Sequence, residues 1–96
     1  MLVVVSYDVS TEDNAGKRRL RRVAKLCESY GQRVQNSVFE CLVDASQWVA
    51  LRAKLVGEIE AREDSLRFYF LGNEWARRIE HVGTKAGYNP EGTLIV

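Results

Sequence analysis

An acidic residue stands directly after a short run of apolar residues at the start of the chain. The run Leu2-Val-Val-Val5 predicts a β-strand buried on both faces, and Tyr7 and Asp8 follow it at the expected exposed end. Ligands of open α/β sheets bind outside the carboxyl ends of the strands. Mg²⁺ is commonly held by one or two carboxylates together with phosphate oxygens. Asp8 is therefore a candidate metal ligand, with capping of the following loop as the alternative.

One carboxylate per chain makes a sparse metal site. Glu12 and Asp13 are better explained as the charges that begin a helix, so a second ligand would have to be the Asp8 of another copy in a two-fold dimer. Two carboxylates that lie close together repel unless a cation or a proton lies between them. We therefore expect one Mg²⁺ or Mn²⁺ at the dimer axis. Asp8 is also the candidate catalytic residue, although no general base is evident.

A block of cations follows this acid in the sequence. Six of the nine residues 17–25 are Lys or Arg, with no acid between them. An exposed helix face normally mixes both signs, so the block indicates contact with nucleic-acid phosphates, and an ordinary solvated face is the alternative. Few aromatic residues lie among the cations, so we expect backbone binding without sequence readout. The candidate nucleic-acid-binding residues are Lys17, Arg18, Arg21, Arg22, Lys25, Arg33, Arg77 and Arg78.

Other kinds of chemistry find little support in the sequence. Cys27 and Cys41 lie 14 positions apart, and His81 is the only histidine, so no zinc-binding spacing is present. We expect two reduced, buried thiols. Ser37 would need a nearby base to act as a nucleophile, and His81 is far along the chain, so Ser37 is predicted to be a turn or cleft residue. The chain has no glycine-rich phosphate loop.

The elements that position these residues can be read from periodicity. A helix is predicted where apolar residues recur at helical spacing, and strands where apolar and polar residues alternate. Gly31 should stop the first helix, and a tight turn near Asn36 should divide the long alternating stretch into two strands. The predicted elements after the first strand are a helix over 17–29, two antiparallel strands within 32–44, a helix over 45–62 and a strand over 65–71 that ends at Gly72.

This order of elements is that of the split βαβ, or ferredoxin-like, α+β sandwich with an antiparallel sheet. Right-handed crossovers place the first strand in the middle of the sheet and both helices on one face. The other face is left bare, and it carries apolar residues such as Tyr69 and Leu71. We therefore expect a second subunit to cover it.

The end of the chain is read as a tail. Residues 73–92 are polar and irregular, with Trp75 and Ile79 as anchors, and 93–96 predict a short extra strand. Because its own sheet is complete, this strand is expected to pair with the sheet edge of a partner and so to form a two-fold homodimer, with pairing inside its own chain as the alternative. The chain is thus predicted to be one domain, with a core over 1–72 and a dimer-pairing tail over 73–96.

Length and composition agree with a small globular protein. The chain has 96 residues, 46% of them hydrophobic, and one proline, which argues against disorder. No apolar run approaches the roughly 20 residues that span a bilayer. The N-terminus lacks the basic region of a signal peptide, and Asp8 interrupts its apolar run. We expect a cytoplasmic protein without membrane contact.

Four stretches together resemble the CRISPR-associated protein 2 family, and the likeness runs nearly end to end. They are Val-Ser-Tyr-Asp8-Val, Lys17-Arg-Arg-Leu-Arg-Arg22, Gly31-Gln-Arg-Val-Gln-Asn-Ser-Val-Phe-Glu40 and Asp64-Ser-Leu-Arg-Phe-Tyr-Phe. The resemblance implies a ferredoxin-like homodimer that joins CRISPR-associated protein 1 to capture and integrate new spacers. It further implies that Asp8 binds a divalent metal at the dimer cleft, with Tyr7, Ser37 and Phe39 as cleft residues.

Two classes of function therefore remain open. One is an adaptor, a dimer that holds duplex DNA and binds the CRISPR-associated protein 1 integrase. The other is a metal-dependent endonuclease acting by itself on DNA or single-stranded RNA, or a toxin-like ribonuclease on the same fold. The residues favour the adaptor, because cations outnumber catalytic groups. A small-molecule-binding domain lacks any sequence support.

Overall fold

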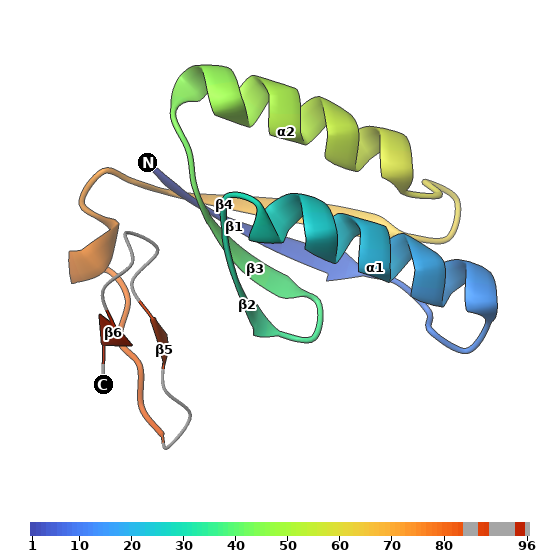
Figure 1. Cartoon of the computed structure of the whole chain (residues 1–96), viewed down its shortest axis with the longest axis horizontal. Coiled ribbons are helices and arrows are strands. Elements are labelled where there is room, and N and C mark those ends of the chain that lie inside the picture. Colours follow the sequence, from blue (N-terminus) through green and yellow to red (C-terminus); the bar gives the residue numbers. More distant parts are fainter. Residues whose placement is uncertain (84–86, 89–93, 96) are drawn as a thin grey trace.

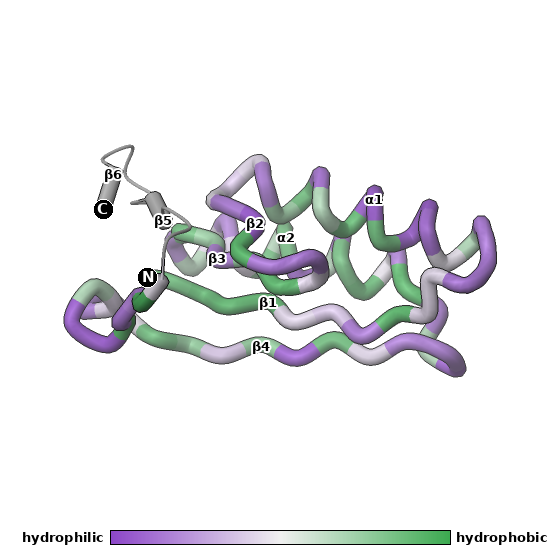
Figure 2. Tube along the Cα trace, turned by 90° about the horizontal axis from the view of Figure 1, so that it is seen from below, coloured by the Kyte–Doolittle hydropathy of each residue, from purple (hydrophilic) through white to green (hydrophobic). Residues whose placement is uncertain are grey.

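The computed structural model describes residues 1–83, 87–88 and 94–95. A four-stranded antiparallel sheet with strand order β2-β3-β1-β4 forms the centre of the molecule, and both helices lie on one of its faces (Figures 1 and 2). The predicted ferredoxin-like α+β fold is confirmed. Its elements are β1 (Leu2–Asp8), α1 (Asn14–Glu28), β2 (Gly31–Gln35), β3 (Val38–Leu42), α2 (Ala45–Glu58), β4 (Ser65–Gly72) and the 3₁₀ helix η1 (Trp75–Arg77).

Strand β1 is central, as expected, but it is not buried on both faces. Val3, Val5 and Tyr7 point into the core and are almost fully buried, whereas Val4 and Ser6 on the other face are half-buried. The predicted burial of the second face is not seen within one chain, because α1 and α2 pack against the same face of the sheet, and cover for the other face depends on the expected second copy. Figure 2 shows β1 and β4 along the side that the helices leave open.

Helix α1 begins three residues before the predicted start. Asp13 is the N-cap, and its side chain accepts a hydrogen bond of 2.7 Å from the backbone N–H of Gly16. Such a cap stabilises a helix by about 1 kcal/mol. Val23 and Cys27 are fully buried on the core side of the helix.

Gly31 follows this helix for a reason that differs from the predicted one. Its φ angle is not positive, so it is not a left-handed helix cap. Instead, a Cβ at this position would lie 1.8 Å from the carbonyl oxygen of Glu40 in the neighbouring strand. The glycine is needed because β3 approaches β2 closely at this point.

The β2–β3 hairpin turns at residues 36–37, as predicted. Phe39, Cys41 and Val43 alternate into the core and are buried. The thiol of Cys41 donates a hydrogen bond of 3.6 Å to the carbonyl oxygen of Cys27, and both cysteines are free. A hydrogen bond with the Cys41 thiol, together with burial, raises the pKa of Cys27. Both thiols are thus free and buried in the core, as expected.

Helix α2 begins at Ala45, as predicted, after a capping box made by Asp44 and Gln47. It ends at Glu58 instead of continuing to residue 62. The chain turns after the helix because the backbone N–H of Glu60 donates to the carboxylate of Asp64 at 3.0 Å, while the N–H of Asp64 donates back to the carbonyl oxygen of Glu60 at 2.7 Å. The helical periodicity of the sequence gave no indication of this turn.

The far face of the sheet and the tail bear on the expected dimer. Tyr69 is 46% exposed on that face, and no described part of the chain covers it. In the tail, β6 (Leu94–Ile95) pairs with β5 (Gly87–Tyr88) of the same chain, so the terminal strand pairs within its own chain, with a strand that was not predicted. The remaining residues of the predicted strand, Thr93 and Val96, lie outside the described residues. The homodimer stays a prediction.

No helix in the described ranges is both long and apolar enough to cross a bilayer.

Candidate functional site

Asp8 lies at the exposed end of β1, on the sheet face opposite to the helices. In the register of β1 with β4, Asp8 faces Ser65 and Ser6 faces Arg67. These residues line a polar hollow of about 410 Å³. The complete lining is Ser6, Tyr7, Asp8, Ser37, Ser65, Arg67 and Tyr69. The structure thus brings together two predicted residues, Asp8 from the end of β1 and Ser37 from the β2–β3 turn.

The carboxylate of Asp8 is exposed and makes no hydrogen bond or ion pair with any described residue. The alternative interpretation, in which Asp8 caps the following loop, therefore finds no contact to support it. Within residues 1–83 and the two short tail strands, no group of three His, Cys, Asp or Glu side chains could hold a metal ion. At this hollow the described residues of one chain thus offer a single free carboxylate, which suits Mg²⁺ only if phosphate oxygens, waters or a second Asp8 complete the shell.

Phe39, an expected cleft residue, does not line this hollow. Its side chain is fully buried in the core because β3 turns it toward the helices. Tyr7 does line the hollow, but its side chain is only 1% exposed and points into the core side of the sheet. The placement of Phe39 in the cleft is therefore wrong, and Tyr7 contributes little accessible surface there.

The hydroxyl of Tyr7 belongs to a buried polar cluster that the sequence analysis did not find. It donates a hydrogen bond to the carboxylate of Asp64, which also pairs with Arg19 through contacts of 2.8 Å and 3.2 Å. The side chain of Asp64 is fully buried and that of Arg19 is 16% exposed. The cluster joins β1, α1 and the start of β4, and so fixes the strand ends that carry Asp8 and Ser65.

The pKa values in this cluster follow from its contacts. Burial by itself would raise the pKa of Asp64, but its hydrogen bonds with Arg19, Tyr7 and the backbone of Glu60 outweigh burial and lower it. Burial and the bond to Asp64 raise the pKa of Tyr7, and the same carboxylate raises the pKa of Arg19. Asp64 and Arg19 are therefore charged and Tyr7 is neutral at neutral pH, and no buried side-chain nitrogen or oxygen of the described residues lacks a hydrogen-bond partner.

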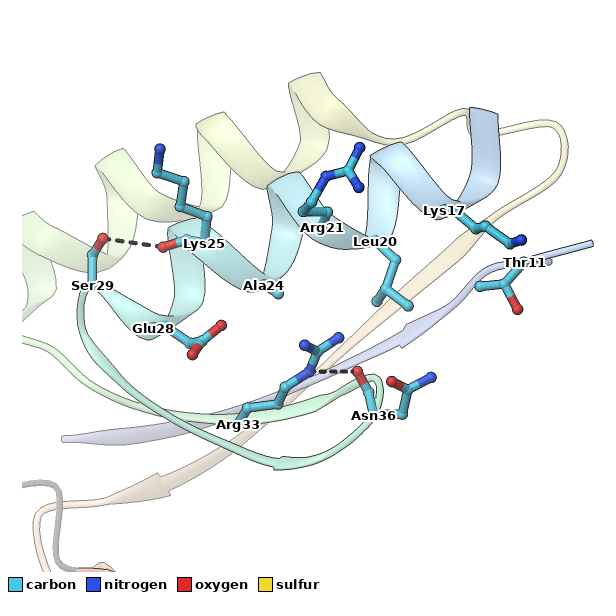
Figure 3. Close-up of a pocket in the computed structure, with 10 residues that line it drawn as sticks. All are labelled: Thr11, Lys17, Leu20, Arg21, Ala24, Lys25, Glu28, Ser29, Arg33 and Asn36. Atoms are coloured by element: carbon cyan, nitrogen blue, oxygen red, sulfur yellow. Dashed lines mark hydrogen bonds between the residues drawn. The ribbon is translucent and has the colours of Figure 1, made fainter. Parts of the chain in front are cut away.

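The block of cations over 17–25 is divided between two sides of α1. Lys17, Arg21 and Lys25 line a hollow of about 730 Å³ between α1 and the β2–β3 hairpin, together with Arg33 (Figure 3). In Figure 3, Arg33 points toward α1, whereas Arg21 and Lys25 extend away from the hairpin. The carboxylate of Glu28 also lies in this hollow, so the lining carries one negative charge among its four positive charges.

Arg18 and Arg22 lie on the other side, toward α2. They line a smaller hollow of about 370 Å³ in which Glu58 and Glu60 also lie. Arg22 approaches Glu58 to 3.9 Å, and both side chains are partly exposed. Because Glu58, the last residue of α2, and Glu60 after the helix offset these cations, this side is the weaker candidate for phosphate contact. The periodicity of a helix separates the two sets, since residues 17, 21 and 25 repeat at four-residue spacing.

Arg33 is the most firmly held of the predicted cations. It sits opposite Phe39 in the hairpin register, with its guanidinium carbon 5.6 Å from the centre of the Phe39 ring. Its Nε also donates a hydrogen bond of 2.8 Å to the carbonyl oxygen of Asn36. Phe39 thus supports a cation instead of lining the cleft. A guanidinium fixed in this way loses less side-chain entropy when it binds a phosphate.

Arg77 and Arg78 lie far from the Asp8 hollow along the sheet. They follow the end of β4 at Gly72, which pairs with Leu2 at the opposite end of β1. Arg77 approaches Glu74 to 3.7 Å, and Arg78 donates a hydrogen bond of 3.0 Å to the carbonyl oxygen of Leu71. The structure therefore does not place them in the same site as Asp8.

Comparison with known proteins places the chain in a family. The sequence pattern of the family described as "CRISPR associated protein Cas2" matches residues 1–79. The chain belongs to the Cas2 family. A Cas2 protein of Chlorobaculum tepidum, named a CRISPR-associated endoribonuclease, is 62% identical over 96 residues and covers all of both chains. A Halalkalibacterium halodurans relative, named the CRISPR-associated endonuclease Cas2, is 50% identical and covers 99% of each chain.

Among solved structures, Streptococcus pyogenes Cas2 superposes with a TM-score of 0.80 and is 55% identical in sequence. The match covers 86% of this chain and 100% of the Streptococcus chain. The resemblance given by the four sequence stretches is confirmed. Two functional candidates of this Cas2-family chain were nevertheless missed. Arg67 is not among the predicted site residues although it lines the Asp8 hollow, and Arg19 belongs to the predicted block of cations although Asp64 holds it in the core.

Proposed function

We propose that this Cas2-family protein is a nucleic-acid-binding homodimer whose bare sheet faces meet about a two-fold axis, with one Mg²⁺ or Mn²⁺ held between two Asp8 carboxylates. The observation that carries the proposal is the free carboxylate of Asp8 in a polar hollow on an uncovered sheet face. The half-buried Val4 and the exposed Tyr69 on that face would gain cover from a second copy.

In this proposal the protein serves CRISPR adaptation, as a DNA-holding adaptor for the CRISPR-associated protein 1 integrase. The hollow between α1 and the β2–β3 hairpin would hold the phosphate backbone through Lys17, Arg21, Lys25 and Arg33. Backbone contacts of this kind give affinity without sequence preference. The adaptor is favoured because the described chain offers several free cations and one free carboxylate at the Asp8 hollow.

The second candidate is a metal-dependent endonuclease, which the names of the relatives favour. A bound divalent ion would stabilise negative charge on a phosphodiester and lower the pKa of a bound water. Asp8 would hold the ion, and the hydroxyl groups of Ser37 and Ser65 would help to position water or phosphate in the same hollow. Single-stranded RNA and duplex DNA are the substrates to compare.

One set of experiments tests the proposal and separates the two candidates. The purified protein is incubated with labelled single-stranded RNA or duplex DNA, in Mg²⁺ or in chelator, and spacer acquisition is measured in cells that supply the integrase. Asp8→Asn is compared with Glu12→Gln, an exposed acid in the neighbouring loop.

The adaptor predicts that Asp8→Asn keeps duplex binding and spacer acquisition. The endonuclease predicts chelator-sensitive cleavage that Asp8→Asn abolishes and Glu12→Gln leaves intact. A protein that binds no duplex at low salt would contradict the adaptor, and cleavage that persists in Asp8→Asn would contradict the endonuclease.

A further inference from the structure

Arg67 and Asp8 share one face of the sheet and one hollow. Arg67 lies opposite Ser6 in the β1–β4 register, and Asp8 lies two residues along β1 from Ser6, opposite Ser65. Side chains two residues apart on a strand point to the same face, so Arg67 and Asp8 are diagonal neighbours. Diagonal positions of an antiparallel pair are about 7–8 Å apart, which long side chains can bridge.

The two charged groups nevertheless do not pair. Among the described residues Arg67 has no ion-pair partner, and its guanidinium instead donates a hydrogen bond of 3.2 Å to the hydroxyl of Tyr69. Asp8 likewise has no partner. Asp8 and Arg67, on the neighbouring strands β1 and β4, therefore both line the polar hollow with free hydrogen-bonding groups.

The chemistry of the hollow suits a phosphodiester. Arg67 has several N–H donors beyond the one that Tyr69 accepts, and a guanidinium matches the paired oxygens of a phosphate. The bond to Tyr69 also raises the pKa of Arg67, so the group stays charged. Ser6, Ser37 and Ser65 add three hydroxyl groups to the lining. The Asp8 carboxylate by itself would repel a phosphate, so a compensating cation on the same face has a clear role.

We propose that Arg67, oriented by the hydroxyl of Tyr69, binds a non-bridging oxygen of the nucleic-acid phosphate that lies beside Asp8. This inference rests on the proposed nucleic-acid function and names a residue that recognises the phosphate there. The other use of such an arginine is an ion pair with an acid of a second copy across the sheet face. The experiment separates the two uses, because replacing Arg67 weakens the dimer only if Arg67 forms an ion pair with the second copy.

The test measures binding of a short labelled single-stranded RNA and of a duplex DNA by fluorescence anisotropy, in Mg²⁺ and in chelator. Arg67→Gln should raise the dissociation constant about tenfold or more, the range for loss of a charge-assisted hydrogen bond. Arg67→Lys should recover part of the lost affinity, since it keeps the positive charge but lacks the paired N–H donors of a guanidinium. Arg52→Gln, an exposed arginine of α2 on the helix side of the sheet, is the matched control and should change binding less than about twofold.

Sedimentation velocity of the same variants completes the design. The proposal is overturned if Arg67→Gln binds both probes as Arg52→Gln does, or if Arg67→Gln weakens binding only by separating the two copies. Failure of the proposed function has a different signature, since the wild-type protein itself would then bind neither probe at low salt. Tyr69→Phe should weaken binding by a smaller factor than Arg67→Gln, because it removes only the group that orients the guanidinium.

Discussion

Asp64 should be among the most costly residues of this small fold to truncate. Its buried carboxylate accepts hydrogen bonds from the guanidinium of Arg19, the hydroxyl of Tyr7 and the backbone N–H of Glu60. Asp64→Ala would leave Arg19 and Tyr7 without their acceptor in a site that water barely reaches. Breaking a buried ion pair by removing one partner costs about 3–5 kcal/mol. That is a large share of the roughly 5–15 kcal/mol that stabilises a typical domain.

Glu63→Ala is the matched control. Glu63 is the neighbouring acid and also reaches Arg19, at 3.4 Å, but its side chain is 65% exposed. Exposed pairs contribute about 0–1 kcal/mol, so this variant should unfold almost as the wild type does. Urea unfolding followed by circular dichroism, at one protein concentration for all variants, measures both free energies. Equal losses for Asp64→Ala and Glu63→Ala would refute the reasoning.

The pH dependence gives a second check with a defined sign. Because the folded protein lowers the pKa of Asp64, the stability that this group contributes is fully present above the ordinary carboxyl pKa of about 3.9. It is lost as the pH falls through the lower folded value. The difference in free energy of unfolding between the wild type and Asp64→Asn should therefore be constant from about pH 5 to pH 8 and narrow only below about pH 4. A difference that grows as the pH falls would contradict this assignment.

Two further predictions concern backbone fit and phosphate contact. Gly57→Ala should raise the free energy of unfolding by up to about 1 kcal/mol, because a Cβ there meets no atom within 4 Å. Gly31→Ala should lower the free energy of unfolding, because its Cβ would lie 1.8 Å from the carbonyl oxygen of Glu40. Urea unfolding of both variants measures this contrast. The double variant Lys17→Gln, Arg21→Gln should bind duplex DNA with a salt slope shallower by about 1.8, if each cation contacts one phosphate. Fluorescence anisotropy over a salt series measures the slope, and an unchanged slope would exclude this hollow as the binding surface.

The fold was predictable because each element carries a strong local pattern. The alternation of Phe39, Cys41 and Val43 and the turn at residues 36–37 placed the hairpin correctly. The end of α2 was not predictable in this way, because it depends on Asp64 bonding to the backbone of Glu60, a contact that helical periodicity does not encode. The one-sided burial of β1 within a single chain was not predictable either, since the same valine run suits a strand covered on one face or on both.

The candidate site was only partly predictable. The position of Asp8 after the first strand placed it at an exposed strand end, as found. The role of Arg19 could not be read from the sequence, because the residue that neutralises it, Asp64, is 45 positions away. Phe39 was assigned to the cleft by resemblance, and only its register opposite Arg33 shows that it supports a cation from the core side. Contacts between distant strands decide such roles.

Calorimetric titration of the protein with Mn²⁺ tests the central claim most directly. If two copies join their bare sheet faces and share one ion between two Asp8 carboxylates, the titration should saturate at one ion for every two chains. Asp8→Asn should abolish the binding heat, and Glu12→Gln should leave it unchanged. Saturation at one ion per chain, or equal heats for the wild type and Asp8→Asn, would contradict the account.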